Sequence, residues 1–227
     1  MSVITRSNFS SVRSETPNFV GELFMNHRPA EVTPKEMTMA FAGSSVHGEV
    51  QEGQRENLSG LHGRLLAARL LVGGLPPFVA NRLRTYALRL AGFQIGRGTV
   101  MWGMPTIIGS GNIYKQLTIG EQCGFNVGCL LELEAPISLG NHVAVGHDVT
   151  ILTSSYIRGG TAQRAGTVLR APVRVEDGAW LAARCVVMPG VTIGAGSVIG
   201  ASVVVDKDVA PNTLLLGNQK ISLARWR

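Results

Sequence analysis

The sequence has few aromatic side chains, few charged side chains and little cysteine. Of its 227 residues, 6% are aromatic and 16% are charged, whereas 45% are hydrophobic and 28 residues are glycine. A chain of this length and hydrophobic content can bury a core, which excludes a disordered protein, a collagen and a small disulfide-stabilised protein. The combination of much glycine and few aromatic residues favours tight turns and small side chains packed in layers.

The three cysteines, Cys123, Cys129 and Cys185, are odd in number and have no CxxC spacing. This pattern fits reduced thiols better than a disulfide framework or a metal site. The first residues, MSVITRSNFS, lack the apolar stretch of a secretory signal. We therefore expect a cytoplasmic protein.

No apolar run is long enough to cross a membrane. The most apolar stretch, Leu65 to Ala80, is interrupted by Arg69, a Gly-Gly pair and a Pro-Pro pair, and a spanning helix needs about 20 apolar residues. The formal charge of +6 comes from arginines spread along the chain without interleaved aromatic residues. The sequence therefore predicts neither a transmembrane span nor a nucleic-acid partner.

The N-terminal part differs in pattern from the rest. Residues 1–60 are polar and aperiodic, which predicts a flexible arm. Residues 61–94 hold two apolar stretches around a Gly/Pro break, which predicts a segment of two short helices. Arg82, Arg84 and Arg89 in the second stretch could face a membrane surface or an acidic ligand, but a solvated helix face is the favoured interpretation.

From Ile95 onward an aliphatic residue recurs every six positions. The members of this series are Leu139, Val145, Ile151, Val175, Leu181, Val187, Ile193, Ile199 and Val205. Four residues after each comes a small or β-branched residue, from Val143 and Val149 to Val203 and Val209. Such a step is typical of a short strand followed by a tight turn, with three steps to an 18-residue coil. We expect an all-β fold, a parallel β-helix over residues 95–210, with a C-terminal tail at 211–227.

Two departures interrupt this repeat. Ile119 and Leu139 are 20 residues apart instead of 18, and we expect a bulge or an altered corner near Gly124 to Asn126 to absorb the difference. A longer segment, residues 153–173, skips the repeat and predicts an ejected loop. Loops held by a rigid scaffold often carry binding or catalytic residues, which makes this loop a candidate site.

The repeats resemble the hexapeptide-repeat acyltransferases, especially sugar O-acetyltransferases of the galactoside, maltose and colanic-acid type. The resemblance covers Ile95 to about Lys220. It implies a left-handed parallel β-helix, a homotrimer, and acetyl-CoA or another acyl-CoA as co-substrate in a cleft between two subunits. It also implies acyl transfer to a hydroxyl of a sugar, glycan or secondary-metabolite acceptor, without a metal.

The same resemblance implies roles for individual residues. Asn126 and Glu134 match positions that contact the acceptor, and Trp180 matches a tryptophan beside the acceptor and the pantetheine. Amide and carboxylate groups suit the recognition of a polyol. The positions that match the acyl-CoA stretch are Ala183, Ala201 and Lys207.

The general base is where this sequence departs from that pattern. The family loop begins with a Thr/Ser run followed by a histidine, whereas Thr153-Ser154-Ser155 precedes Tyr156 here. A tyrosine hydroxyl is almost fully protonated at neutral pH, and loss of a positioned base costs about 100- to 10,000-fold in rate. His147, nine residues earlier, is a second catalytic candidate. At the C-terminal end, Gln219 replaces the family proline.

These departures leave more than one function open. The leading hypothesis is a CoA-dependent O-acyltransferase with an atypical active site. The alternative is a catalytically silent or repurposed trimeric scaffold that binds a ligand or performs different chemistry. His142 and His147 are similar to two zinc ligands of the γ-class carbonic anhydrases, but residues 106–108 offer no third histidine for a catalytic zinc, so no metal site is predicted.

Overall fold

The computed structural model describes residues 60–217 and 219–222, and the side chains only as far as residue 217. The predicted N-terminal arm, up to residue 59, lies outside the described residues, as do residues 218 and 223–227 of the predicted tail. Within the described part no helix is long and apolar enough to cross a membrane.

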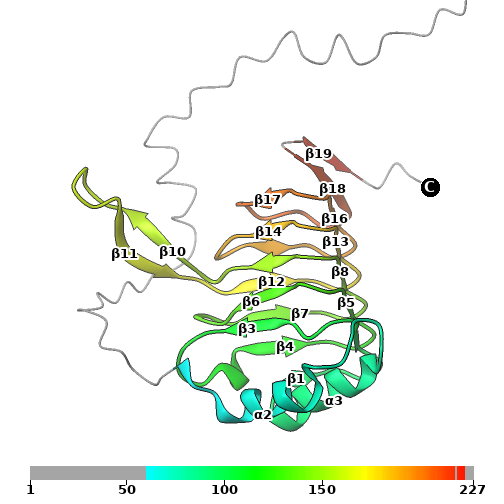
Figure 1. Ribbon diagram of the computed structural model, residues 1–227. Coiled ribbons are helices and arrows are strands. Elements are labelled where there is room, and N and C mark those ends of the chain that lie inside the picture. The colour runs from blue at the N-terminus through cyan, green and yellow to red at the C-terminus, as the bar shows by residue number, and fades with distance from the viewer. Residues whose placement is uncertain (1–59, 218, 223–227) are drawn as a thin grey trace, which may run out of the picture. The chain divides into compact units, whose positions relative to one another are not determined.

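Two helices precede the strands and lie at one end of them (Figure 1). They are α2 (Gly63–Val72) and α3 (Asn81–Ala91). Each buries one stripe of small and aliphatic residues spaced by three or four positions, including Leu65, Ala68 and Val72 in α2, as expected of helices packed on one face. α3 ends at Gly92, whose φ of 108° lies in the left-handed region that favours glycine.

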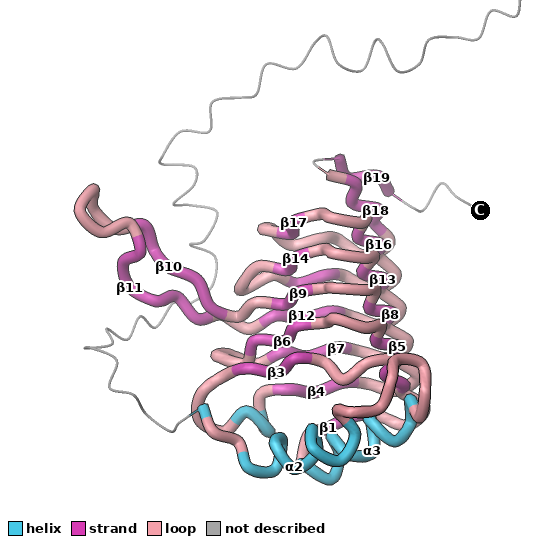
Figure 2. Tube along the Cα trace, viewed as in Figure 1, coloured by secondary structure: helices cyan, strands magenta, loops and turns pink. Residues whose placement is uncertain are grey.

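The strands form a solenoid whose coils each contribute one strand to each of three parallel sheets (Figure 2). Sheet A contains β1 (Gln94–Ile95), β4 (Leu117–Ile119), β7 (Ile137–Leu139), β12 (Val173–Val175) and β15 (Thr192–Ile193). Sheet B contains β2 (Val100–Met101), β5 (Gly124–Phe125), β8 (Ala144–Val145), β13 (Trp180–Leu181), β16 (Val198–Ile199) and β18 (Thr213–Leu216), with β19 (Gln219–Ser222) antiparallel at its edge. Sheet C contains β3 (Thr106–Ile108), β6 (Leu130–Glu132), β9 (Thr150–Ile151), β14 (Val186–Val187) and β17 (Val204–Val205). The predicted left-handed parallel β-helix is confirmed.

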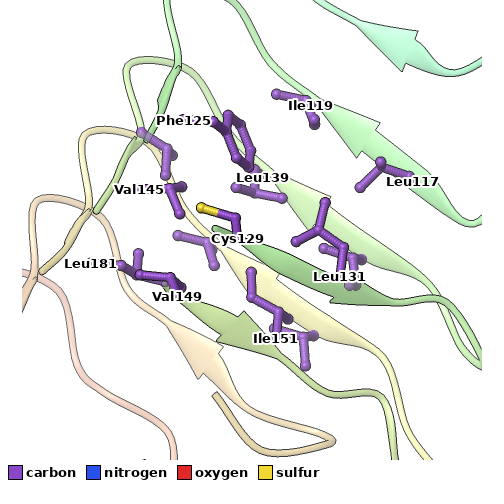
Figure 3. Close-up of a cluster of buried hydrophobic side chains, with 14 of the residues drawn as sticks. Leu117, Ile119, Phe125, Cys129, Leu131, Leu139, Val145, Val149, Ile151 and Leu181 are labelled. Atoms are coloured by element: carbon purple, nitrogen blue, oxygen red, sulfur yellow. The ribbon is translucent and has the colours of Figure 1, made fainter. Parts of the chain in front are cut away.

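The residues of the six-residue series fill the inside of the solenoid (Figure 3). Their rungs stack in register, so that Val145 pairs with Leu181 and Leu181 with Ile199. The residues four positions later are buried beside them, except Ser155, which belongs to a hairpin outside the core. Each coil thus buries its aliphatic face against its neighbours, which is how stability accumulates in a solenoid.

All three cysteines are free and buried in this core. Burial disfavours the charged thiolate and raises the pKa of Cys129 to about 11 and that of Cys185 to about 12. The buried cysteines therefore behave as small apolar residues that fill the layers between the aliphatic rungs.

Close approach of successive coils explains the aliphatic-glycine pairs. A Cβ added to Gly96 would lie 2.4 Å from the backbone of Gly120, and one added to Gly120 would lie 2.4 Å from the carbonyl oxygen of Gly140. No side chain fits at such distances, so only glycine lets the backbones of adjacent coils stack here.

The corners of the solenoid differ in length. From sheet A to B and from B to C, equivalent inward residues are always six positions apart, as in Ile119, Phe125 and Leu131. From sheet C to A the spacing varies, and we call this the C–A corner: residues 109–116, 133–136, 152–172, 188–191 and 206–208. The two extra residues between Ile119 and Leu139 therefore lie at 133–136. The predicted bulge near Gly124 to Asn126 is wrong, because β5 there keeps its six-residue step and pairs with both neighbouring strands.

The longest excursion at the C–A corner is a two-stranded hairpin. Its antiparallel strands are β10 (Ser154–Arg158) and β11 (Ala165–Arg170), and it extends away from the solenoid between β9 and β12 (Figure 1). The first coil carries a short 3-10 helix, η2 (Ile113–Lys115), at the same corner.

Candidate functional site

A polar cluster holds the base of the hairpin. Thr153 is fully buried, and its hydroxyl donates to the carbonyl oxygen of Glu132 at 2.7 Å and accepts from the backbone N–H groups of Glu134 and Ala135, both at 3.0 Å. The Glu132 carboxylate accepts from the N–H groups of Thr153 and Ser154 and from the Ser154 hydroxyl, at 2.9 to 3.0 Å. These bonds join the start of the hairpin to the extended corner of the preceding coil and set its direction.

Glu134 belongs to a second polar cluster on the same corner. Its carboxylate accepts from Arg170 Nε at 3.2 Å and from Ser110 Oγ at 2.9 Å. The predicted acceptor-binding carboxylate therefore also connects the first coil, the second coil and the end of the hairpin. Its side chain is 21% exposed, so it combines a structural ion pair with access to solvent.

Tyr156 lies on the hairpin itself. It pairs with Val168 across the two strands, and its side chain is 61% exposed. Lys207 is also exposed on the C–A corner, in the turn after β17. Glu134, Tyr156 and Lys207 thus share one corner of the solenoid.

A different group of predicted residues lies at the corner between sheets B and C, which we call the B–C corner: residues 102–105, 126–129, 146–149, 182–185 and 200–203. His147, Ala183 and Ala201 occupy the same turn position in successive coils, because the N–H after each donates to the carbonyl one coil below. Asn126 lies in the coil below His147, half-buried, with its side-chain oxygen 3.0 Å from the N–H of Val127.

His147 has the exposure expected of a reactive group. Its side chain is exposed at the B–C corner and takes part in no hydrogen bond to any described residue. The positions beside it in the next two coils are alanine and glycine, at 182–183 and 200–201. The imidazole thus has small neighbours on that side, while the exposed Arg184 side chain of the same corner is paired with Asp148 at 3.7 Å.

Trp180 extends this group onto the outer face of sheet B. It lies on β13, where its rung neighbours are Ala144 and Val198, and it is 52% exposed. Its partner in the strand, Leu181, is fully buried, so the alternation of a two-residue strand places the indole outside.

The structure therefore brings the predicted residues together in two groups instead of one. Sheet C separates the B–C corner from the C–A corner within a single chain. His142 lies on neither, since its backbone, with a φ of 57°, forms the turn between sheets A and B. Among residues 60–217, no group of three His, Cys, Asp or Glu side chains could hold a metal ion.

The spacing of residues along the sequence does not reveal which residues anchor the hairpin. Glu132 and Thr153 lie 21 residues apart, and Arg170 lies inside the predicted loop 153–173. A signal was present in the alternation Glu-Leu-Glu at 132–134, which places two carboxylates beside a corner that is longer than the repeat allows.

Several known proteins are similar to this chain in sequence. The sequence profile of the family described as bacterial transferase hexapeptide (six repeats) matches residues 172–207. A galactoside O-acetyltransferase of Lactococcus lactis is 35% identical over 103 residues, which are 45% of this chain and 50% of that protein. The chain spans about half the length of the curated relatives that it matches over such shorter segments.

Two further matches extend over more of the chain. A protein of Escherichia coli named as a colanic acid biosynthesis acetyltransferase is 30% identical over 145 residues, 64% of this chain and 76% of that protein. A crystal structure of a hexapeptide-repeat acetyltransferase from Vibrio cholerae, complexed with acetyl coenzyme A, has 27% identity and a TM-score of 0.61, covering 78% of this chain and 92% of that one. The six-residue step, the three-sheet solenoid and these matches lead to one conclusion: the chain belongs to the hexapeptide-repeat acetyltransferase family.

Proposed function

We propose that this protein is an O-acyltransferase that transfers an acyl group, in the first instance acetyl, from coenzyme A to a hydroxyl of a sugar, glycan or secondary-metabolite acceptor. The observation that carries the proposal is the match of the solenoid to an acetyltransferase complexed with acetyl coenzyme A. The galactoside O-acetyltransferase among the relatives supports a sugar hydroxyl as acceptor. In the reaction the acceptor oxygen attacks the thioester carbon, the C–S bond breaks, and the hydroxyl proton passes through a base to the leaving thiolate.

The protein acts as a homotrimer in this proposal. Within one chain, sheet C separates the hairpin with Tyr156 from the B–C corner with His147. A site that needs both is incomplete in a monomer, and a second copy can present its hairpin to the B–C corner of the first. Coenzyme A then lies along Ala183 and Ala201 of one subunit, with Lys207 of the partner subunit near its phosphates.

Within that site the two catalytic candidates have different roles. The exposed imidazole of His147 accepts the hydroxyl proton, because histidine is the side chain that gains and loses a proton near neutral pH. Tyr156 donates a hydrogen bond that orients the acceptor or the forming oxyanion. Asn126 and Trp180 hold the acceptor, the amide by hydrogen bonds and the indole by contact with a sugar face.

The test is acetyl-CoA turnover with a panel of sugar acceptors, measured as acceptor-dependent release of the CoA thiol. We expect His147→Asn to lower the rate by about 100- to 10,000-fold. The matched control is His142→Asn, another exposed histidine in a corner turn, which leaves the rate within about twofold. Equal rates for all three proteins would contradict the role of His147.

Sharing of the site between subunits has its own test. Tyr156→Phe subunits are unfolded and refolded together with His147→Asn subunits. Mixed trimers contain some sites with both native residues, so activity recovers above that of either variant alone. A mixture that forms trimers of the native mass but recovers no activity would contradict a shared site.

The scaffold alternative is tested by binding and by a gain of function. Calorimetry measures acetyl-CoA binding to the wild-type chain and to Lys207→Ala, and weaker binding by the variant supports the cofactor assignment. Binding without turnover by the wild type, together with turnover by Tyr156→His, would favour a scaffold that lost its base. No binding by a folded trimer would contradict both the cofactor and the transfer reaction.

The three free, buried thiols also support the cytoplasm as the proposed compartment, because reduced cysteines persist in a reducing environment. Fractionation of cells that express the chain at native level tests it. Recovery outside the cytoplasmic membrane would contradict this location.

A further inference from the structure

The charge of the described chain is unevenly distributed along the solenoid. Residues 60–120 contain six arginines and one lysine but no aspartate or glutamate. All eight acidic residues of the described part lie between Glu121 and Asp208. The two ion pairs within residues 60–217, Arg170–Glu134 and Arg184–Asp148, involve none of the seven cations. The helices α2 and α3 and the first coil, which lie at one end of the solenoid (Figure 1), therefore carry cations and no carboxylate.

The same end exposes large apolar side chains on both helices. They are Leu66, Leu70 and Leu71 on α2, and Leu83, Tyr86 and Leu90 on α3, with exposed fractions from 42% to 79%. In α3 the three residues follow a spacing of three and four, so they form one stripe on the side opposite the buried Leu88. Each helix thus has one apolar face packed on the solenoid and a second that is not covered by any described residue.

The loop between the helices exposes two more apolar residues to solvent. Phe78 is 59% and Val79 is 50% exposed. Both Phe78 and Ala80 have a positive φ, at 65° and 53°, a conformation that costs a residue other than glycine of the order of 1 kcal/mol or more. The strained backbone therefore exposes the Phe78 ring to solvent, where more than half of its surface is not buried against described residues.

Arg84 fixes that loop. It is 1% exposed, and its guanidinium donates to the carbonyl oxygens of Leu75, Pro76 and Val79 at 2.6 to 2.8 Å. The expectation of a solvated face is therefore wrong for Arg84, which is buried because it satisfies three loop carbonyls. Arg82, two positions earlier in α3, is exposed. Three hydrogen bonds from the buried Arg84 therefore hold the loop that exposes Phe78 and Val79.

We propose that this surface, defined by the exposed residues of α2, α3 and the Phe78 loop together with Arg64, Arg82 and Arg97, binds the surface of an anionic lipid bilayer. Leucine and phenylalanine enter the boundary of the acyl chains, and the arginines contact the phosphates. Amphipathic helices that lie in the interface combine these two features. An anionic cytoplasmic leaflet attracts such cations.

The positive charge of this surface favours an anionic lipid bilayer over a second copy of this chain as its partner. Two copies of the same face in a twofold contact would oppose arginine to arginine, with no carboxylate from residues 60–120 between them. A bilayer supplies anionic groups and an apolar layer at once. The inference concerns the end of the solenoid and stands whether or not the proposed transfer reaction is right.

The experiment is flotation of the full-length protein with extruded vesicles of phosphatidylcholine, with and without 30% phosphatidylserine. We expect binding to the anionic vesicles that is lost in 0.5 M salt. Leu70→Ser with Phe78→Ser weakens binding at least tenfold, since each loses an inserted apolar group. Arg82→Gln with Arg97→Gln weakens it about 25-fold, at about fivefold for each cation.

Matched controls lie elsewhere on the same fold. Val204→Ser with Leu216→Ser removes two similarly exposed apolar residues from the solenoid away from the helices, and Arg158→Gln with Arg164→Gln removes two cations from the hairpin. Both pairs bind as the wild type does. Circular dichroism and light scattering confirm that every variant is folded and has the wild-type mass.

Three results would overturn the proposal. The folded wild type fails to float with anionic vesicles, or the control pairs lose as much binding as the helix pairs do. The third result is a smaller mass of the Leu70 and Phe78 variant than of the wild type by light scattering. It would identify the surface as a contact between copies of the chain.

Discussion

The corners of the solenoid fall into two classes. At the A–B and B–C corners every coil uses the same six-residue step, as in Val175, Leu181 and Val187. At the C–A corner the equivalent step is 12 residues from Ile107 to Ile119, 8 from Leu131 to Leu139 and 24 from Ile151 to Val175. It then shortens to 6 from Val187 to Ile193. All the variation in coil length therefore lies at the C–A corner of the solenoid.

This contrast shows where the fold tolerates change. A residue added within the two constant corners would turn the next side chain from the core to the solvent, because successive side chains of a strand alternate. At the C–A corner the added chain leaves the prism and returns in register, so the core is undisturbed. The hairpin with Tyr156 and the Glu134–Arg170 pair both lie there, which is why this corner carries half of the candidate site.

The largest expected effect compares two neighbours on one strand. Leu181→Ala removes a fully buried rung of the core and lowers the free energy of unfolding by about 3–5 kcal/mol. Trp180→Ala, next to it but 52% exposed, costs less than about 1 kcal/mol. Urea unfolding followed by circular dichroism measures both. Similar losses for the two variants would contradict the assignment of inward and outward positions.

The next effect concerns the base of the hairpin. Thr153→Val keeps the shape of the side chain but leaves the buried N–H groups of Glu134 and Ala135 without their acceptor. We expect a loss of about 2–3 kcal/mol in the same unfolding assay. Thr153→Ser retains the hydroxyl and is the matched control. If valine cost no more than serine, the hydroxyl would not anchor the corner.

A third prediction uses the buried thiols of the constant corners. Because the folded pKa of Cys129 is raised to about 11, its thiol stays protonated in the folded chain while the unfolded chain ionises near pH 9. Stability is therefore fully present below pH 9 and falls as the pH rises toward 11, by about 1–2 kcal/mol at pH 10.5. Unfolding of the wild type and Cys129→Ala at pH 8 and pH 10.5 isolates this contribution. The same pH dependence in both proteins would show that the thiol does not contribute.

The smallest effect belongs to the tip of the hairpin. Deletion of Thr161 and Ala162, between β10 and β11, changes the free energy of unfolding by less than about 0.5 kcal/mol, because loop length affects closure entropy only weakly. Deletion of two residues in the turn at 183–184 serves as the comparison and prevents folding or lowers stability by several kcal/mol. Equal tolerance of both deletions would remove the distinction between the corners.

Much of the architecture could be predicted from one sequence because the repeat is local. The step from Leu139 to Val145 to Ile151 encodes a strand, a turn and an inward side chain without reference to distant residues. The misplaced bulge has a different cause. The spacing from Ile119 to Leu139 shows that a coil is two residues longer, but it does not show which of three corners contains them. Only the pairing of Phe125 and Leu131 with their neighbours identifies 133–136.

The sequence by itself determined the coils, the inward residues and the position of the ejected segment, because a six-residue period acts within a few neighbouring residues. Tertiary structure decided which residues share a corner. It placed His147 and Tyr156 on different corners, buried Arg84 on loop carbonyls, and paired Glu134 with Arg170 across 36 residues. The physical reason is that these arrangements depend on how coils stack and where the chain leaves the prism, and neither is encoded in the spacing of aliphatic residues.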